Sequence, residues 1–95
     1  MPGAETPGRS DQAKAGVVLR QLATTDADPK VRQSAIRALG RVRGSDGTIT
    51  TTIKALETIA RTDVHVKVRT EAVTALGKIG TVDAQEALVR ILSGN

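Results

Sequence analysis

The single histidine of the chain, His65, lies two residues after Asp63 in the stretch DVHVKVR. A histidine beside a carboxylate could act as a general base or bind a metal. A protein metal site, however, needs a set of about three or four ligands, and the chain has no second histidine and no cysteine. The carboxylates are scattered, and no Ser–His–Asp arrangement or carboxylate pair emerges. We therefore expect His65 to lie at the surface or to cap a helix, and we expect no catalytic residue, metal or cofactor.

The stretch RGSDG, residues 43–47, has two glycines but lacks the G-x-x-x-x-G-K-[ST] pattern of a phosphate-binding loop. Its polar and flexible composition predicts a connector between helices. A contact loop remains an alternative, because insertions in repeat proteins often map to one binding face.

Charge and composition indicate the kind of partner. The net charge is +4, which favours an anionic partner, either an acidic protein surface or a phosphate backbone. The chain contains no aromatic residue, so it lacks stacking platforms for bases, and no recognition-helix or zinc motif is present. Nucleic-acid binding through phosphate contacts is therefore the alternative, and an acidic protein surface is the first choice.

Five helices are predicted by apolar residues that recur at steps of three and four. We expect a first helix from about residue 11 to 24, a second from 29 to 42, a third through residue 60, a fourth from 65 to 79 and a fifth from residue 83. Pro29 fits the first turn of the second helix, and Ser45 or Asp46 can cap the third. The β-branched stretch TITTTI, residues 48–53, could also form a strand, but the helical spacing continues through Ala60. The apolar stripe of the first helix is expected to consist of Ala15, Val18, Leu19 and Leu22.

The two ends of the chain differ from this pattern. Residues 1–10 contain Pro2, Gly3, Pro7 and Gly8 and predict a disordered N-terminal tail, followed by one domain over residues 11–95. At the other end, the last helix has no following partner, so Leu88, Ile91 and Leu92 are expected to be half covered. A homodimer through this open C-terminal end is therefore one possibility to test.

A repeat with a period of 37 residues relates the second and fourth helices. Val31 and Arg32 match Val68 and Arg69, and Ala35-x-x-Ala38-Leu39-Gly40 matches Ala72-x-x-Ala75-Leu76-Gly77. The register extends upstream, where Leu22, Ala23 and Asp26 match Ile59, Ala60 and Asp63. A helix pair repeated at this period is typical of an α-solenoid, in which each unit buries its face against the next.

The doubled motif, Asp followed six residues later by Arg and then by A-x-x-A-L-G, resembles HEAT repeats. The most similar variety is the short prokaryotic phycobilisome-lyase-type HEAT-like repeat, and the resemblance covers about residues 11–93. It implies an all-α fold, a short α-solenoid (α-α superhelix) of about five helices in two and a half HEAT-like pairs. It also implies a structural Asp–Arg ladder between units formed by Asp26, Arg32, Asp63 and Arg69.

In solenoids of this type the second helix of each pair usually lines the concave, ligand-facing side. We therefore predict a non-catalytic, cytoplasmic interaction or scaffold module that binds another protein through this face. No signal peptide or membrane-spanning segment is expected, and thus no membrane partner. The predicted partner-binding residues are Lys30, Arg37, Arg41, Lys67, Thr74 and Lys78.

Overall fold

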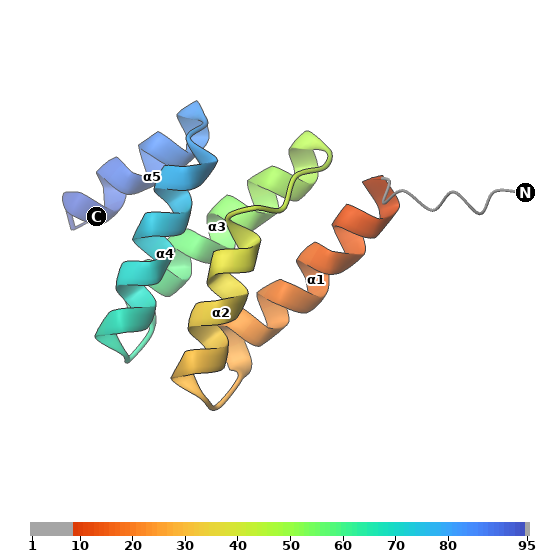
Figure 1. The fold of residues 1–95 in the computed structure, drawn as a ribbon. Coiled ribbons are helices and arrows are strands. Elements are labelled where there is room, and N and C mark those ends of the chain that lie inside the picture. The colour runs from red at the N-terminus through yellow and green to blue at the C-terminus, as the bar shows by residue number, and fades with distance from the viewer. Residues whose placement is uncertain (1–8, 95) are drawn as a thin grey trace, which may run out of the picture.

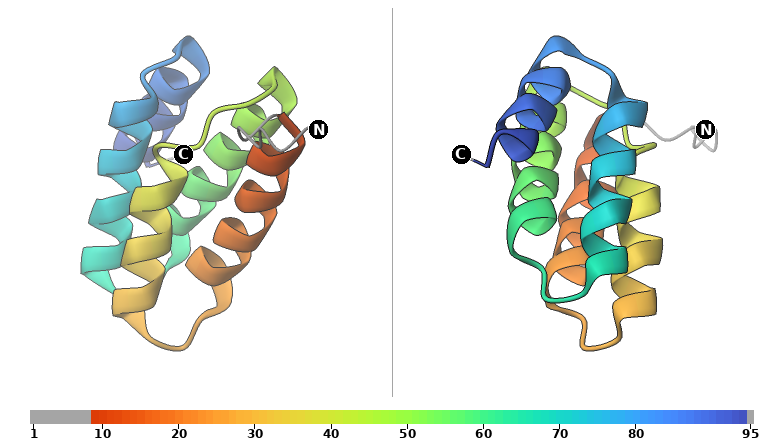
Figure 2. Two further views of the ribbon diagram at one scale, coloured as in Figure 1. Left: turned by 45° about the vertical axis from the view of Figure 1, so that its right-hand side comes forward. Right: turned by 90° about the vertical axis from the view of Figure 1, so that its left-hand side faces the viewer.

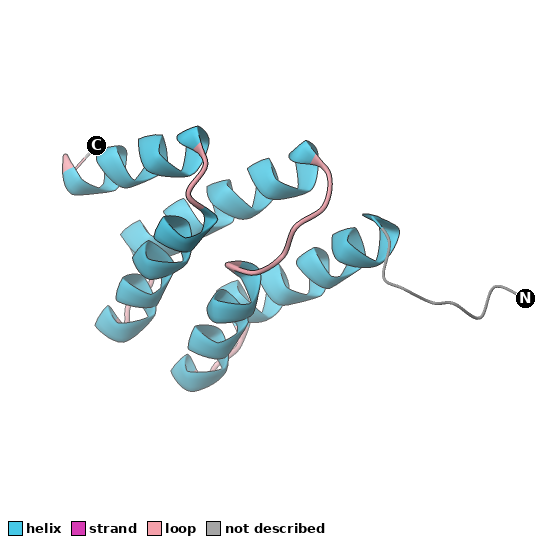
Figure 3. Cartoon of the chain, turned by 45° about the horizontal axis from the view of Figure 1, so that its top comes forward, coloured by secondary structure: helices cyan, strands magenta, loops and turns pink. Residues whose placement is uncertain are grey.

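The computed structural model describes the backbone of residues 9–94 and contains five helices, with no strand in that range (Figure 3). The helices are α1 (Arg9–Thr25), α2 (Pro29–Leu39), α3 (Asp46–Thr62), α4 (Val66–Ile79) and α5 (Val82–Leu92). They form two layers: α1, α3 and α5 lie side by side in one, and α2 and α4 in the other (Figures 1 and 2). The all-α solenoid of two and a half helix pairs is thus confirmed.

Side chains before each helix explain where four of the five begin. Asp28 accepts a hydrogen bond from the Lys30 amide (2.8 Å), with Pro29 at the first position of α2. Equivalent caps come from Ser45, His65 and Thr81, each of which accepts a hydrogen bond from an amide in the first turn that follows. Such bonds satisfy amides that have no partner within the helix. The prediction that His65 caps a helix is confirmed.

The helix boundaries correct the sequence analysis at α1 and α2, and they decide between the helix and the strand predicted for residues 48–53. Helix α3 includes the β-branched stretch 48–53, so the strand alternative is wrong. Helix α2 ends at Leu39 rather than Val42, because the amides of Arg41 and Val42 bond to carbonyls three residues earlier and form a tight turn. Residues 1–8 of the predicted disordered tail lie outside the described residues, and α1 begins at Arg9, two residues earlier than expected.

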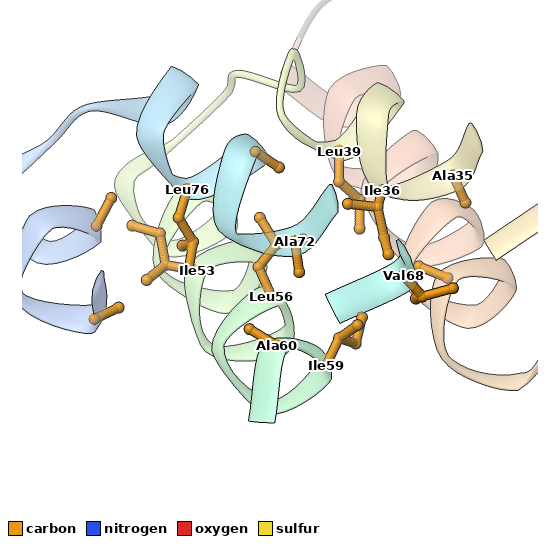
Figure 4. Packing of buried hydrophobic residues seen from close by; sticks show 14 residues of the cluster. Ala35, Ile36, Leu39, Ile53, Leu56, Ile59, Ala60, Val68, Ala72 and Leu76 are labelled. Atoms are coloured by element: carbon orange, nitrogen blue, oxygen red, sulfur yellow. The ribbon is translucent and has the colours of Figure 1, made fainter. Parts of the chain in front are cut away.

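Small aliphatic residues build the core between the two layers (Figure 4). Leu39, Leu56 and Leu76 are fully buried at its centre. Around them the alanines keep the helix axes close, since thin side chains permit close packing. The alanines of this cluster are Ala23, Ala35, Ala60, Ala72, Ala75, Ala84 and Ala87.

The buried face of α1 differs from the predicted stripe. Ala23 is fully buried, whereas Val18 is 55% and Leu22 38% exposed, and Ala15 is also exposed. The cause is the position of α1 at one end of its layer, where it packs mainly on α2 and α3 (Figure 1). In α3, which lies between α1 and α5, Ile59 is the equivalent of Leu22 and is buried.

The opposite end of the layer is also uncovered. Leu88 and Ile91 of α5 pack partly against the core, while Leu92 is 82% exposed. The expectation of half-covered residues is therefore confirmed for Leu88 and Ile91, whereas Leu92 is exposed because no further helix packs beside α5 in the described range. No helix among the described residues is long and apolar enough to cross a membrane.

Candidate functional site

The two helix pairs are joined by a buried ion pair between Arg32 of α2 and Asp63, which precedes α4. Arg32 Nε donates to Asp63 Oδ2 at 2.9 Å, and Nη2 donates to Oδ1 at 3.2 Å. Both side chains are about nine-tenths buried, and Nη1 donates to the Asp26 carbonyl at 2.7 Å. This third bond fixes the guanidinium so that its fork faces the carboxylate, a geometry that favours bidentate pairing.

The other two members of the predicted ladder repeat parts of this arrangement. Arg69 Nη1 donates to the Asp63 carbonyl at 2.7 Å, as Arg32 does to the Asp26 carbonyl. Asp26 Oδ1 accepts from the Asp28 amide at 2.9 Å, as Asp63 Oδ1 does from the His65 amide at 2.8 Å. Among the described residues, however, neither Arg69 nor Asp26 has an ion-pair partner. The structure therefore brings Arg32 and Asp63 together and leaves both ends of the series open.

Burial and hydrogen bonding act in opposite directions on Asp63. Burial alone would raise the pKa of its carboxyl. The hydrogen bonds from Arg32 and from the His65 amide, together with the charge of Arg32, outweigh burial and hold this pKa below its ordinary value. Asp63 is thus a charged structural group at neutral pH.

A hollow of about 510 Å³ lies between the ends of α1 and α3, beside this ion pair. Its walls carry four threonine hydroxyls, and each of these donates to the carbonyl four residues earlier in its own helix. The threonines are Thr24, Thr25, Thr58 and Thr62. Because these hydroxyls are already engaged, the hollow offers little convergent polarity for binding or catalysis.

The charges of the two layers differ strongly. Helices α2 and α4 together carry six basic residues and one acidic residue, Glu71. Helices α1, α3 and α5 together carry six basic and five acidic residues. The positive excess of the chain is therefore concentrated in the α2–α4 layer.

All six predicted partner-binding side chains lie on this layer or directly after it, and all are exposed: Lys30, Arg37, Arg41, Lys67, Thr74 and Lys78. Five of the six are cations, but Arg37 is not a free one, since its Nε donates to Glu71 Oε1 at 3.2 Å. Lys67 and Thr74 also line a shallow hollow of about 210 Å³ on this surface. The remaining lining residues are Gln33, Val66, Thr70 and Glu71.

The sequence analysis missed a second charged cluster, on the other layer. Glu57 of α3 accepts two hydrogen bonds from Arg90 of α5, at 2.9 and 2.8 Å, and forms an ion pair with Arg61 at 3.0 Å. The Arg90 hydrogen bonds lower the pKa of Glu57, and this effect exceeds the rise caused by partial burial. The i,i+4 spacing of Glu57 and Arg61 was a visible signal for one pair, but the contact with Arg90 depends on how α5 packs against α3.

Comparisons with known proteins define the class. A family model described as HEAT repeats matches residues 16–95. The chain therefore belongs to the HEAT-repeat family, whose members are typically non-catalytic scaffolds for protein–protein interaction. A search of curated proteins and a search of solved structures found no match. The narrower similarity to phycobilisome-lyase-type repeats stays a prediction.

No group of three or more histidine, cysteine or acidic side chains that could hold a metal ion occurs in the part of the chain that the structure describes. His65 is instead engaged as a cap, with Nδ1 accepting from the Lys67 amide at 3.3 Å. The described site is therefore a charged helical surface with shallow hollows.

Proposed function

We propose that this protein is a non-catalytic interaction module that binds an acidic protein surface through the exposed side of the α2–α4 layer. The observation that carries this proposal is the charge difference between the layers. Without the buried Arg32, α2 and α4 carry five basic residues and one acidic residue, whereas α1, α3 and α5 carry six basic and five acidic residues. Such a one-sided field attracts an acidic partner and orients it toward one face.

The proposed contact residues are Lys30, Lys67, Arg41 and Lys78, with Arg37 and Thr74 beside them. Lys30 and Lys67 occupy equivalent positions of α2 and α4, as do Arg41 and Lys78, so the repeat places the cations in two rows. The hollow lined by Lys67, Thr70 and Thr74 gives the face a recess for a partner side chain. The module is also proposed to act in the cytoplasm.

The test compares two double variants with the same change of charge. Lys30→Ala with Lys67→Ala removes two exposed cations from the α2–α4 layer, and Lys14→Ala with Lys54→Ala removes two exposed cations from the α1–α3–α5 layer. The immobilised chain is used to capture partners from host lysate after nuclease treatment. We expect a discrete protein that the first variant loses and the second retains. Equal retention by both variants would contradict the assignment of this face.

Phosphate-backbone binding is tested in parallel with a mixed-sequence DNA duplex. We expect weak DNA binding for two reasons. The proposed binding face includes the acidic Glu71, which repels phosphate, and the chain has no aromatic side chain to stack a base. Tight DNA binding that falls steeply with salt and is lost in the Lys30 and Lys67 double variant would assign the layer to nucleic acid instead.

A further inference from the structure

The side of α2 that faces α4 includes three residues spaced four apart, Arg32, Ile36 and Gly40. Arg32 is paired with Asp63, Ile36 is fully buried, and Gly40 is also buried, close to Ala75 of α4. Residues at this spacing share one face of a helix. The contact therefore consists of an ion pair, an apolar side chain and a close backbone approach.

Helix α4 carries the same stripe 37 residues later, as Arg69, Val73 and Gly77. Here Arg69 and Val73 are only half-buried and Gly77 is exposed. A Cβ built on Gly77 would meet nothing within 4 Å, whereas one on Gly40 would meet the Ala75 Cβ at 3.3 Å. No helix in the described range covers this side of α4.

The Arg69 guanidinium has the orientation in which Arg32 binds its carboxylate. Its Nη1 donates a hydrogen bond to the Asp63 carbonyl, as Arg32 Nη1 does to the Asp26 carbonyl. Its Nε and Nη2 have no partner among the described residues. In Arg32, Nε and Nη2 are the two groups that bind Asp63. The third unit follows at a shorter spacing of 32 residues, as from Leu56 to Leu88, so the position in register with Asp63 is Asn95. This residue has an amide in place of a carboxylate and lies outside the described residues.

A hollow of about 360 Å³ adjoins Arg69 and extends to α5. It is lined by Ala60, Arg61, Ile91 and Gly94 in addition to Arg69, so positive charge lies beside apolar surface. Leu92 of α5 is 82% exposed, although Ala60, its equivalent in α3, is buried. Both α4 and α5 thus leave a face open next to the same hollow.

We propose that this groove beside α4 and α5 docks one amphipathic helix of a partner protein, with an aspartate just before the helix bound by Arg69 and a stripe of small residues packed on Gly77. The chemistry of the occupant is given by the equivalent groove within the molecule, where Asp63 binds Arg32 and Ala72 and Ala75 belong to the buried core of the following helix. The proposal is independent of the binding face proposed above, because it depends on the lateral side of α4.

The probe for this site is a synthetic peptide with the sequence of residues 63–80, DVHVKVRTEAVTALGKIG. A lactam bridge between its Lys67 and Glu71 side chains, which are four positions apart, keeps the free peptide helical, so that failure to bind is not caused by the cost of helix formation. The peptide is titrated into the isotope-labelled full chain and followed by NMR. We expect shift changes confined to amides around Arg69, Val73, Gly77 and Leu92.

Three variants of the chain and one variant of the peptide give the test its specificity. Arg69→Gln in the chain should weaken binding of the peptide about tenfold. Asp63→Asn in the peptide should weaken its binding to the wild-type chain by the same factor, and the two changes together should cause no further loss. Gly77→Leu should abolish binding by filling the groove, while the thermal melt stays cooperative because the site has open space. Lys54→Gln, at an exposed position of α3 and with the same change of charge as Arg69→Gln, should bind normally.

The proposal is overturned if the peptide shows no shift changes, or if the changes are centred elsewhere, or if Gly77→Leu leaves them intact. Sedimentation of the peptide-free chain tests whether a second copy of the chain, rather than a partner protein, occupies the groove. A concentration-dependent dimer that Gly77→Leu dissociates would assign the groove to a second copy of this chain and overturn the partner-protein assignment.

Discussion

Gly40 of α2 lies directly against Ala75 of α4, where an added Cβ would meet the Ala75 Cβ at 3.3 Å and its Cα at 3.4 Å. This contact is a close approach of two helix backbones between successive units. Gly77, 37 residues later on α4, has no such neighbour. The same residue type thus has a packing role in one unit and an open surface in the next.

We predict opposite effects for alanine at the two glycines. Gly77→Ala should raise the free energy of unfolding by about 0.5–1 kcal/mol, because alanine is the better helix former and its Cβ meets nothing. Gly40→Ala should lower it by about 1 kcal/mol, since the overpacked contact forces α2 and α4 apart. Urea denaturation measures the free energy of unfolding of both variants. Equal stabilisation by the two substitutions would contradict the packing role of Gly40.

Thr52 in the centre of α3 offers a stabilising substitution. Its side chain is 1% exposed, and its hydroxyl has no hydrogen-bond partner among the described protein atoms. Valine has nearly the same shape without the polar group, and an unsatisfied buried hydroxyl is costly. We therefore expect Thr52→Val to raise the free energy of unfolding by about 1 kcal/mol, measured by urea denaturation.

Thr51→Val is the control for Thr52→Val, because Thr51 is exposed on the same helix and its hydroxyl donates to the Gly47 carbonyl. This substitution should change stability by less than about 0.5 kcal/mol. A loss of stability in Thr52→Val would indicate that the hydroxyl is satisfied after all, for instance by a water molecule.

The two arginines at equivalent positions should differ in their contribution to stability. Arg32→Ala leaves the buried Asp63 carboxylate without its partner and should cost about 3 kcal/mol or more. Arg69→Ala should cost less than about 1 kcal/mol, because no carboxylate in the described chain depends on it. Equilibrium urea unfolding separates the two.

Arg32→Lys covers the case in which Arg32→Ala does not fold. It keeps the charge but loses the fork that binds both Asp63 oxygens, so its stability should fall between that of the wild type and that of Arg32→Ala. Equal losses for Arg32→Ala and Arg69→Ala would contradict the assignment of Arg32–Asp63 as the buried contact between units.

The repeat made most of this fold predictable. A period of 37 placed Arg32 and Arg69, and Gly40 and Gly77, at equivalent positions, and helical spacing gave the five helices with small boundary errors. A repeat pattern describes an interior unit, however, in which both flanks are covered. It therefore failed at α1, where Leu22 repeats the pattern of the buried Ile59 and is nevertheless 38% exposed.

The candidate site was predictable in composition but not in pairing. Exposure of Lys30 and Lys67 follows from helix periodicity, which is local information. The contacts Arg37–Glu71 and Glu57–Arg90 join residues 34 and 33 positions apart. Such contacts depend on how helices pack between units, which no single helix pattern specifies.

The Arg32–Asp63 pair also predicts how stability depends on pH. The pKa of Asp63 is lowered from its ordinary value of 3.8, so the unfolded chain takes up a proton at a pH where the folded chain remains ionised. The stabilisation is fully present above the unfolded pKa and is lost as the pH falls through the folded pKa. We expect the free energy of unfolding, measured by urea denaturation, to decline progressively below about pH 5.

Asp63→Asn tests this origin of the pH dependence. The amide cannot titrate, so this variant should be less stable at neutral pH and should show a smaller decline on acidification. Glu57→Gln is the matched comparison, because the Arg90 hydrogen bonds lower the pKa of Glu57 from 4.5. This variant should remove a separate part of the decline in the free energy of unfolding. Parallel curves for the wild type and Asp63→Asn would mean that the pair between units does not control acid stability.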